Sequence, residues 1–140
     1  IVAEVGAVVI GSATAPGTFE ERLDLISDSL TAALFAQPFA ARVIVREAMD
    51  WGPFVRGQIS ESLVPVMEAA EMFILAGQAE GAFAKRDAKQ LIITLIGVHF
   101  MPFAIGNVVA AFTGTQPFDQ RFFEARRDAV RAQVRGLVLA

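Results

Sequence analysis

His99 is the side chain in this sequence best suited to chemistry, because it is the single histidine and stands in a run without charge, Leu91 to Phe112. Pro102 follows it and cannot donate the backbone hydrogen bond that Val98 would accept, so we expect the helix to bend or open there. Three roles are open to His99. It is a histidine satisfied by a neighbouring group, a polar anchor in a ligand pocket, or a metal ligand.

Ordinary metal and catalytic motifs are missing from the sequence. One histidine and no cysteine do not make an ordinary zinc site. The Glu-x-x-His pairs of di-iron bundles are absent too, since Ile96 stands three residues before His99. Glu68 and Glu71 fall near one another on a helix, which fits a solvated face or, as the weaker alternative, a catalytic carboxylate pair. We therefore expect no enzyme, no catalytic residue, no metal and no cofactor.

Apolar, aromatic and sulfur-containing side chains are the chemistry that remains. The chain has 12 Phe, 4 Met and 1 Trp, and no Tyr. Such residues fill cores, but together they also suit a pocket for an apolar ligand, which needs few polar anchors. Methionine adapts to varied ligand shapes. The predicted ligand-binding residues are Phe35, Met49, Trp51, Phe54, Met67, Phe73, His99, Phe100 and Phe103.

The elements that must position these side chains are helices. Apolar residues recur at a helical period almost throughout, which predicts an all-α, antiparallel bundle of about five to six helices. Thr18 with Glu21, and Asp87 with Gln90, have the spacing of capping boxes at two helix starts. Pro65 predicts a kink inside a long helix. The predicted helices cover residues 1–13, 18–37, 38–50, 52–79, 87–114 and 118–139.

Composition bounds the class of protein. The chain has 140 residues, which suggests one domain. Its net charge of −3 gives no basic footprint for nucleic acid. Hydrophobic residues make up 54%, so the chain either sits in lipid or buries more surface than a monomer can. The N-terminal stretch lacks the basic start of a signal peptide, and because the first residue is Ile1 we expect the chain to begin inside a larger protein.

The uncharged run is long enough to cross a bilayer, but its context favours a protein interface. Gly97, Pro102 and Gly106 interrupt it, no belt of Trp or Tyr flanks it, and the neighbouring helices have charged faces. We expect no membrane contact and a homodimer, in which helices 87–114 and 118–139 of each subunit form an intermolecular four-helix bundle. The predicted interface residues are Leu95, Val98, Pro102, Ile105, Phe122, Phe123, Arg126, Val130, Val134 and Leu137.

The order of helices resembles the C-terminal ligand-binding and dimerisation domain of TetR-family transcriptional regulators. The similar segments are FEERLDLISDSLTAALFAQPFAARVIVREAM, then GPFVRGQISESLVPVMEAAEMFILAGQAEGAFAKRDAKQLIITLIG, then a closing amphipathic helix. The piece GQAEGAF, followed by a polar turn and a long apolar helix, is the most similar to the family. The resemblance covers nearly the whole chain.

The resemblance implies a small-molecule-sensing domain of a cytoplasmic repressor. Residues 1–140 would be the effector-binding and dimerisation domain, with residues 1–13 the remnant of a connecting helix. An apolar or aromatic effector would allosterically control operator DNA binding by an N-terminal helix-turn-helix domain. The sequence departs from the complete family pattern, since residues 1–140 contain no such domain. A helical membrane-associated protein and a dimerisation module without ligand stay as alternatives.

Overall fold

The chain folds as an all-α bundle. The computed structural model describes residues 2–140, apart from the side chains of residues 54, 55, 59 and 60. The elements are α1 (Val2–Ala13), α2 (Phe19–Ala36), α3 (Ala40–Asp50), α4 (Pro53–Gln58), the π-helical η1 (Ile59–Leu63), α5 (Val64–Ala79), α6 (Ala88–Ala104), α7 (Gly106–Thr113) and α8 (Gln120–Val138). Because α4, η1 and α5 are continuous, these elements make seven helices. The predicted all-α class is confirmed.

Side-chain caps begin two of the helices where the sequence predicts them. Thr18 Oγ1 accepts from the backbone N–H of Glu21 at 3.1 Å, and the Glu21 carboxylate accepts from the N–H of Thr18 at 3.1 Å. At the start of α6, Asp87 Oδ1 accepts from the N–H of Gln90 at 3.0 Å. These bonds satisfy N–H groups that have no partner inside a helix, and so they fix where α2 and α6 begin.

At Pro65, where the sequence predicts a kink, the structure has a π-helical turn directly before the helical turn that contains the proline. The five residues of η1, Ile59–Leu63, lie directly before α5, whose first turn contains Pro65. Proline lacks an N–H and its ring crowds the preceding turn, so the local hydrogen-bond pattern widens.

The uncharged run of the sequence forms two helices, which corrects the predicted count of five to six. Pro102 lies inside the last turn of α6, and the chain bends by 77° between α6 and α7 at Ile105. The start of α7 lies so close to Phe118 that a Cβ atom added at Gly106 would lie 2.7 Å from Cζ of that ring. Glycine therefore lets α7 turn beneath the Phe118 ring.

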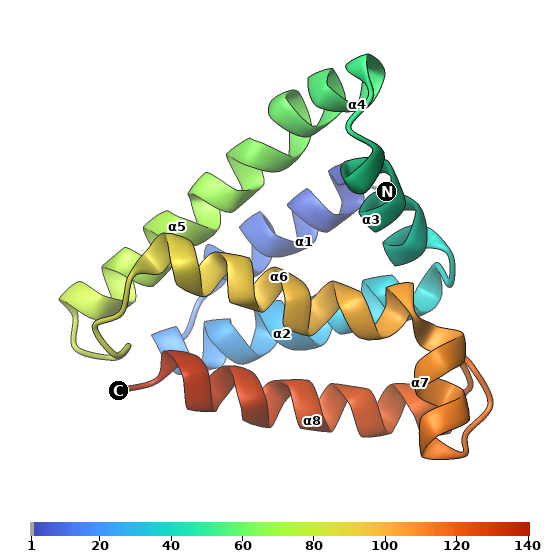
Figure 1. Ribbon diagram of the computed structural model, residues 1–140. Coiled ribbons are helices and arrows are strands. Elements are labelled where there is room, and N and C mark those ends of the chain that lie inside the picture. Colours follow the sequence, from blue (N-terminus) through green and yellow to red (C-terminus); the bar gives the residue numbers. More distant parts are fainter. Residues whose placement is uncertain (1) are drawn as a thin grey trace.

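α5 and α6 form the two sides of a wedge, and α1 is seen between them (Figure 1). In that view α6 and α8 run antiparallel across the front of the molecule, with α2 packed behind them. α1 packs against α2 and α5, and α3 packs against α6. α5 and α6 diverge from the turn that joins them, and α3 spans the wide end of the wedge.

Two clusters of buried side chains hold this arrangement. The first joins the narrow end of the wedge to α8 and contains Leu23, Phe73, Ile74, Phe83, Ala88, Leu91, Ile92, Val130, Val134 and Val138. The second lies toward α3 and α7 and contains Val5, Leu30, Leu34, Ala41, Phe100, Phe103, Ala110 and Phe122. Burial of these apolar groups is the main stabilising term of the fold.

The apolar stripe of α8, which holds several of the predicted interface residues, packs inside its own chain. Phe122, Val130 and Val134 are only 4%, 1% and 2% exposed. Side chains already removed from water gain nothing by meeting a second copy. The stripe faces α2, and ion pairs from Arg131 to Asp28 and from Arg135 to Asp24 line its edge.

The other predicted interface residues are divided between core and surface. Leu95, Val98 and Leu137 are partly buried against the first cluster, and Phe123 stacks on Phe35 with ring centroids 4.7 Å apart. Pro102 and Arg126 are half-buried, whereas Ile105 is exposed.

A candidate apolar ligand-binding site

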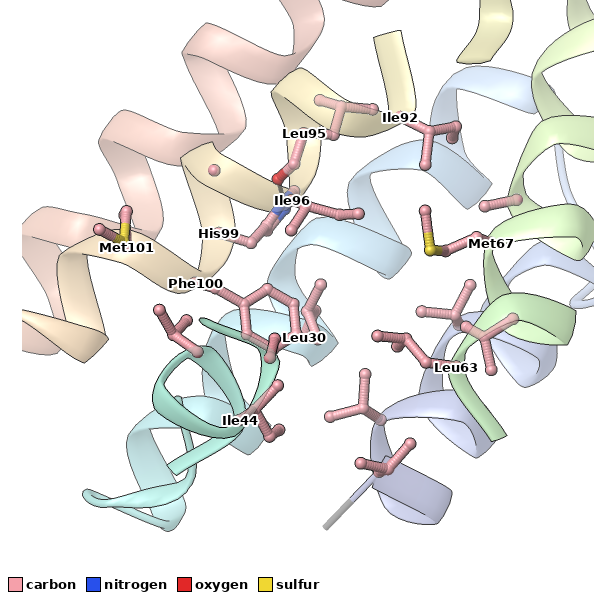
Figure 2. Close-up of a pocket in the computed structure, with 18 of the residues that line it drawn as sticks. Leu30, Ile44, Leu63, Met67, Ile92, Leu95, Ile96, His99, Phe100 and Met101 are labelled. Atoms are coloured by element: carbon pink, nitrogen blue, oxygen red, sulfur yellow. Dashed lines mark hydrogen bonds between the residues drawn. The ribbon is translucent and has the colours of Figure 1, made fainter. Parts of the chain in front are cut away.

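A cavity of about 450 Å³ occupies the wedge between α5 and α6. Figure 2 shows side chains from both helices pointing into it, with α1 and α2 behind and α3 at one end. Its lining residues are Val2, Val5, Val9, Ile26, Leu30, Ile44, Val45, Ala48, Met49, Leu63, Val66, Met67, Ala70, Ile92, Leu95, Ile96, Gly97, His99, Phe100 and Met101. Among these residues, His99 has the only side chain with nitrogen or oxygen.

One wall of the cavity is the apolar face of α1. Val2, Val5 and Val9 lie on that face at helical spacing. Gly6, beside them, allows α1 to approach α5, because a Cβ atom there would lie 2.8 Å from Cγ2 of Val66. The close contact places the first helix of the chain directly against any molecule in the cavity.

His99 is held in place by two hydrogen bonds within the chain. Its Nδ1 lies 2.8 Å from the carbonyl oxygen of Leu95, and its Nε2 lies 2.8 Å from Oγ of Ser27. Because a carbonyl can only accept, Nδ1 carries the proton, and Nε2 accepts from the Ser27 hydroxyl. Both ring nitrogens are therefore occupied, as in the first of the three roles proposed for this histidine. The ring still forms part of the cavity wall.

The electrostatics keep His99 neutral. Burial lowers its pKa below the ordinary value near 6.5, and the nearby positive charge of Arg126 also lowers it. The hydrogen bond to the carbonyl oxygen of Leu95 acts in the opposite direction and raises the pKa. A neutral, satisfied ring offers a ligand an aromatic surface and no charge. The described walls of the cavity can thus hold a neutral apolar molecule.

The structure brings four of the nine predicted ligand-binding residues to the cavity: Met49, Met67, His99 and Phe100. Phe73 and Phe103 do not line it. Phe73 packs edge-on against Phe83 in the first core cluster, and Phe103 does the same against Phe122 in the second.

Two further predicted positions, Phe35 and Trp51, also lie away from the described cavity wall. Phe35 stacks on Phe123, so its ring is used in packing α2 against α8. Trp51 is half-exposed and ends α3 in a left-handed conformation, with φ of 48°. The side chain of Phe54 falls outside the described residues.

Sequence reasoning missed the aliphatic character of the cavity. Most of its wall consists of Val, Leu, Ile and Ala side chains, whereas we predicted aromatic walls. The signal that could have found one wall is the spacing of Val2, Val5 and Val9, which marks an apolar face on α1. Several aromatic rings lie in the core instead: Phe19, Phe73 and Phe83 contact one another at the narrow end of the wedge.

The part of the chain that the structure describes shows no metal site of the usual kind. Within residues 2–140, no group of three or more His, Asp or Glu side chains could hold a metal ion. No single helix of this range is long and apolar enough to cross a membrane, whereas the bent pair α6 and α7 passes by length and composition only.

Comparison with known proteins adds no assignment. No protein-family model matches the chain, and no curated protein sequence matches it.

Proposed function

We propose that this chain is the effector-binding and dimerisation domain of a TetR-like transcriptional repressor, and that its effector is a neutral apolar small molecule. The observation that carries the proposal is the apolar cavity of about 450 Å³. Protein interiors are close-packed and leave few voids larger than a water molecule. Ligand pockets commonly measure about 300–1,000 Å³. The size and lining of this cavity fit a ligand site better than a packing defect.

The polarity of the wall supports the class of effector. A charged or strongly polar molecule would lose its hydration and find no free hydrogen-bonding partner on the described walls. His99, the one polar side chain among them, already has both ring nitrogens bonded within the chain. Hydrocarbon and aromatic molecules lose little by leaving water and gain dispersion contacts with the aliphatic walls.

The position of α1 supports the regulatory role. Its valines touch the cavity, so a bound molecule would favour one placement of α1 relative to α5 and α6. In a TetR-like protein, this helix would lead to the DNA-reading head. The effector would act by population shift, and a coupling of about 1–3 kcal/mol between effector and operator DNA would give a usable switch. The domain would be cytoplasmic and have no enzymatic activity.

A fluorescent apolar probe tests the proposal. We expect N-phenyl-1-naphthylamine, a neutral aromatic dye, to bind the chain with increased emission and to raise its melting temperature, as any ligand of the native state does. Ala70→Phe should fill part of the cavity and weaken probe binding at least about tenfold, because the ring takes the space of the ligand. Ala76→Phe is the matched control, since Ala76 is exposed on the same helix.

Two outcomes would contradict the proposal. Equal probe binding by the two variants would place the probe elsewhere than the cavity. No rise in melting temperature with this dye or with a broad set of apolar compounds would favour a dimerisation module without ligand. A chain that stays in solution only with detergent would favour the membrane-associated alternative.

A further inference from the structure

The sulfur atoms of this chain are concentrated at the cavity. The sequence has 4 Met and no Cys, so thioethers are its only sulfur groups. Met49, Met67 and Met101 line the cavity, whereas the fourth methionine, Met72, is 72% exposed on α5 and lies outside the lining. A thioether sulfur is soft and polarisable, and unlike a thiol it can react with an electrophile without first losing a proton.

Met67 is the methionine whose sulfur a bound molecule would meet. Figure 2 shows its side chain extending from α5 into the cavity, toward Ile92 and Ile96 of α6. Met67 is half-buried and packs against the first core cluster. Bulk solvent therefore reaches its sulfur less than it reaches that of Met72, while a molecule held in the cavity lies beside it.

The walls determine which electrophile suits this position. A charged reagent would lose its hydration and find no free hydrogen-bonding partner on the described walls. An organic hydroperoxide with a hydrocarbon group keeps that group against the aliphatic side chains. Transfer of its oxygen leaves a neutral sulfoxide, whereas an alkylating agent would leave a sulfonium cation that apolar walls do not stabilise. The chemistry of the site therefore favours oxidation over alkylation.

Resting on the proposed function, we infer that the cavity binds apolar organic hydroperoxides and that Met67 is the residue they oxidise. A lone pair of the Met67 sulfur attacks the terminal oxygen of R–O–O–H, and the O–O bond breaks as the S–O bond forms. The thioether is oxidised to a sulfoxide and the hydroperoxide is reduced to the alcohol R–OH. The proton of the hydroperoxide passes to the departing oxygen, so the step needs no further reactant.

Oxidation of Met67 would make part of an apolar wall polar. The sulfoxide oxygen is a hydrogen-bond acceptor, but His99, the one lining side chain with nitrogen or oxygen, already has both ring nitrogens bonded. An unpaired polar group beside an apolar ligand weakens binding. The oxidised chain should therefore bind its apolar effector less tightly, so that exposure to a hydroperoxide changes the response to the effector.

Met67 and Met72 form a matched pair for the test, because both lie on α5 and only one lines the cavity. The whole chain is treated with cumene hydroperoxide or with hydrogen peroxide, and tandem mass spectrometry gives the oxidation rate of each methionine. Hydrogen peroxide should oxidise Met72 faster, because it is the more exposed. Cumene hydroperoxide should raise the ratio of Met67 to Met72 oxidation at least about tenfold over that value, because binding holds the reagent beside Met67.

Blocking the cavity should remove this preference. An excess of N-phenyl-1-naphthylamine, or the substitution Ala70→Phe, should return the ratio with cumene hydroperoxide to its value with hydrogen peroxide, and neither should change the rate at Met72. Ala76→Phe, on the exposed side of the same helix, should keep the preference. Competition by the dye uses the unaltered chain, so it decides the matter if Ala70→Phe does not fold.

The effect on binding is measured with the same dye after the hydroperoxide is removed. Treatment with cumene hydroperoxide should weaken dye binding at least about tenfold in the unaltered chain and in Met72→Leu. Met67→Leu lacks the reactive sulfur, so its dye affinity should be the same before and after treatment.

The opposite results overturn the inference in separate ways. A ratio of Met67 to Met72 oxidation that is equal for the two peroxides, in a chain that binds the dye, shows that the cavity does not take up the hydroperoxide and leaves the proposed function standing. Oxidation of Met67 without loss of dye affinity refutes its regulatory role. Failure of the dye to bind counts against the proposed function itself, while the oxidation ratio still reports on the hydroperoxide.

Discussion

The hydroxyl of Ser27 donates a hydrogen bond to Nε2 of His99 across 2.8 Å, and this bond joins α2 to α6 beside the cavity. Both residues are buried, and Thr31 donates in turn to the carbonyl oxygen of Ser27 at 2.8 Å. A polar bond within an apolar wall fixes the orientation of the imidazole ring. It also makes the stability of the fold depend on the protonation state of His99.

Ser27→Ala should destabilise the protein by about 1–3 kcal/mol, because it leaves Nε2 of His99 buried without a donor. Urea unfolding at pH 8, where the histidine is neutral in both states, measures the change. Ser29→Ala is the control on the same helix: Ser29 is half-buried, and its substitution should stay within about 0.5 kcal/mol. Equal losses in the two variants would show that the Ser27 bond adds nothing specific.

Stability should fall as the pH drops below about 6.5, the ordinary pKa of histidine. The pKa of His99 is lowered in the folded chain, mainly by burial. The unfolded chain therefore binds a proton at a higher pH than the folded chain does, and protonation favours unfolding. The contribution is fully present above the unfolded pKa and is lost as the pH falls from there toward the folded pKa.

Two measurements check the pH dependence. His99→Gln should remove the loss of unfolding free energy between pH 6.5 and pH 5 that wild type shows, while carboxylate effects at lower pH remain in both. Since His99 is the single histidine, its ring-proton resonance gives the folded pKa directly. A folded pKa at or above 6.5 would refute the assignment.

Phe103→Ala should cost about 3–5 kcal/mol of stability, as large-to-small substitutions of buried Phe do. Phe103 is 1% exposed and contacts the rings of Phe118 and Phe122. Phe112→Ala is the matched control, since Phe112 is 91% exposed and its substitution should leave the monomer unchanged within about 0.5 kcal/mol. Thermal unfolding compares the two. A small effect at Phe103 together with weakened probe binding would restore it to the ligand site.

Gly77→Ala should destabilise the fold, although alanine is the better helix former. A Cβ atom at Gly77 would overlap the ring of Phe83 inside the first core cluster, so the ring or the helix must move. We expect this movement to lower the free energy of unfolding by about 1–3 kcal/mol. Gly11→Ala should instead stabilise the fold, because nothing lies within 4 Å of the added Cβ atom. The higher helix propensity of alanine should then raise the free energy of unfolding by about 0.5–1 kcal/mol. Urea unfolding of both variants decides, and a gain at both sites would show that the Phe83 contact yields easily.

The sequence determined the helices and most of their ends. The periodicity of apolar residues, the caps at Thr18 and Asp87, and the disturbance at Pro65 are local features, and local hydrogen bonding and sterics decide them. It also singled out His99 and the uncharged run around it. These properties depend on neighbours a few residues apart in the chain, which a sequence displays directly.

The tertiary structure decided which apolar side chains meet one another. Phe73 and Phe103 look like pocket residues in the sequence, as Met67 and Phe100 do, but only the crossing of the helices separates core from cavity. The stripe of α8 packs against α2, and no periodicity within α8 could say whether its partner lies in the same chain or in another. Hydrophobic burial is non-directional. The sequence therefore shows that these apolar faces must be covered, whereas only the packing of distant segments shows which helix covers each face.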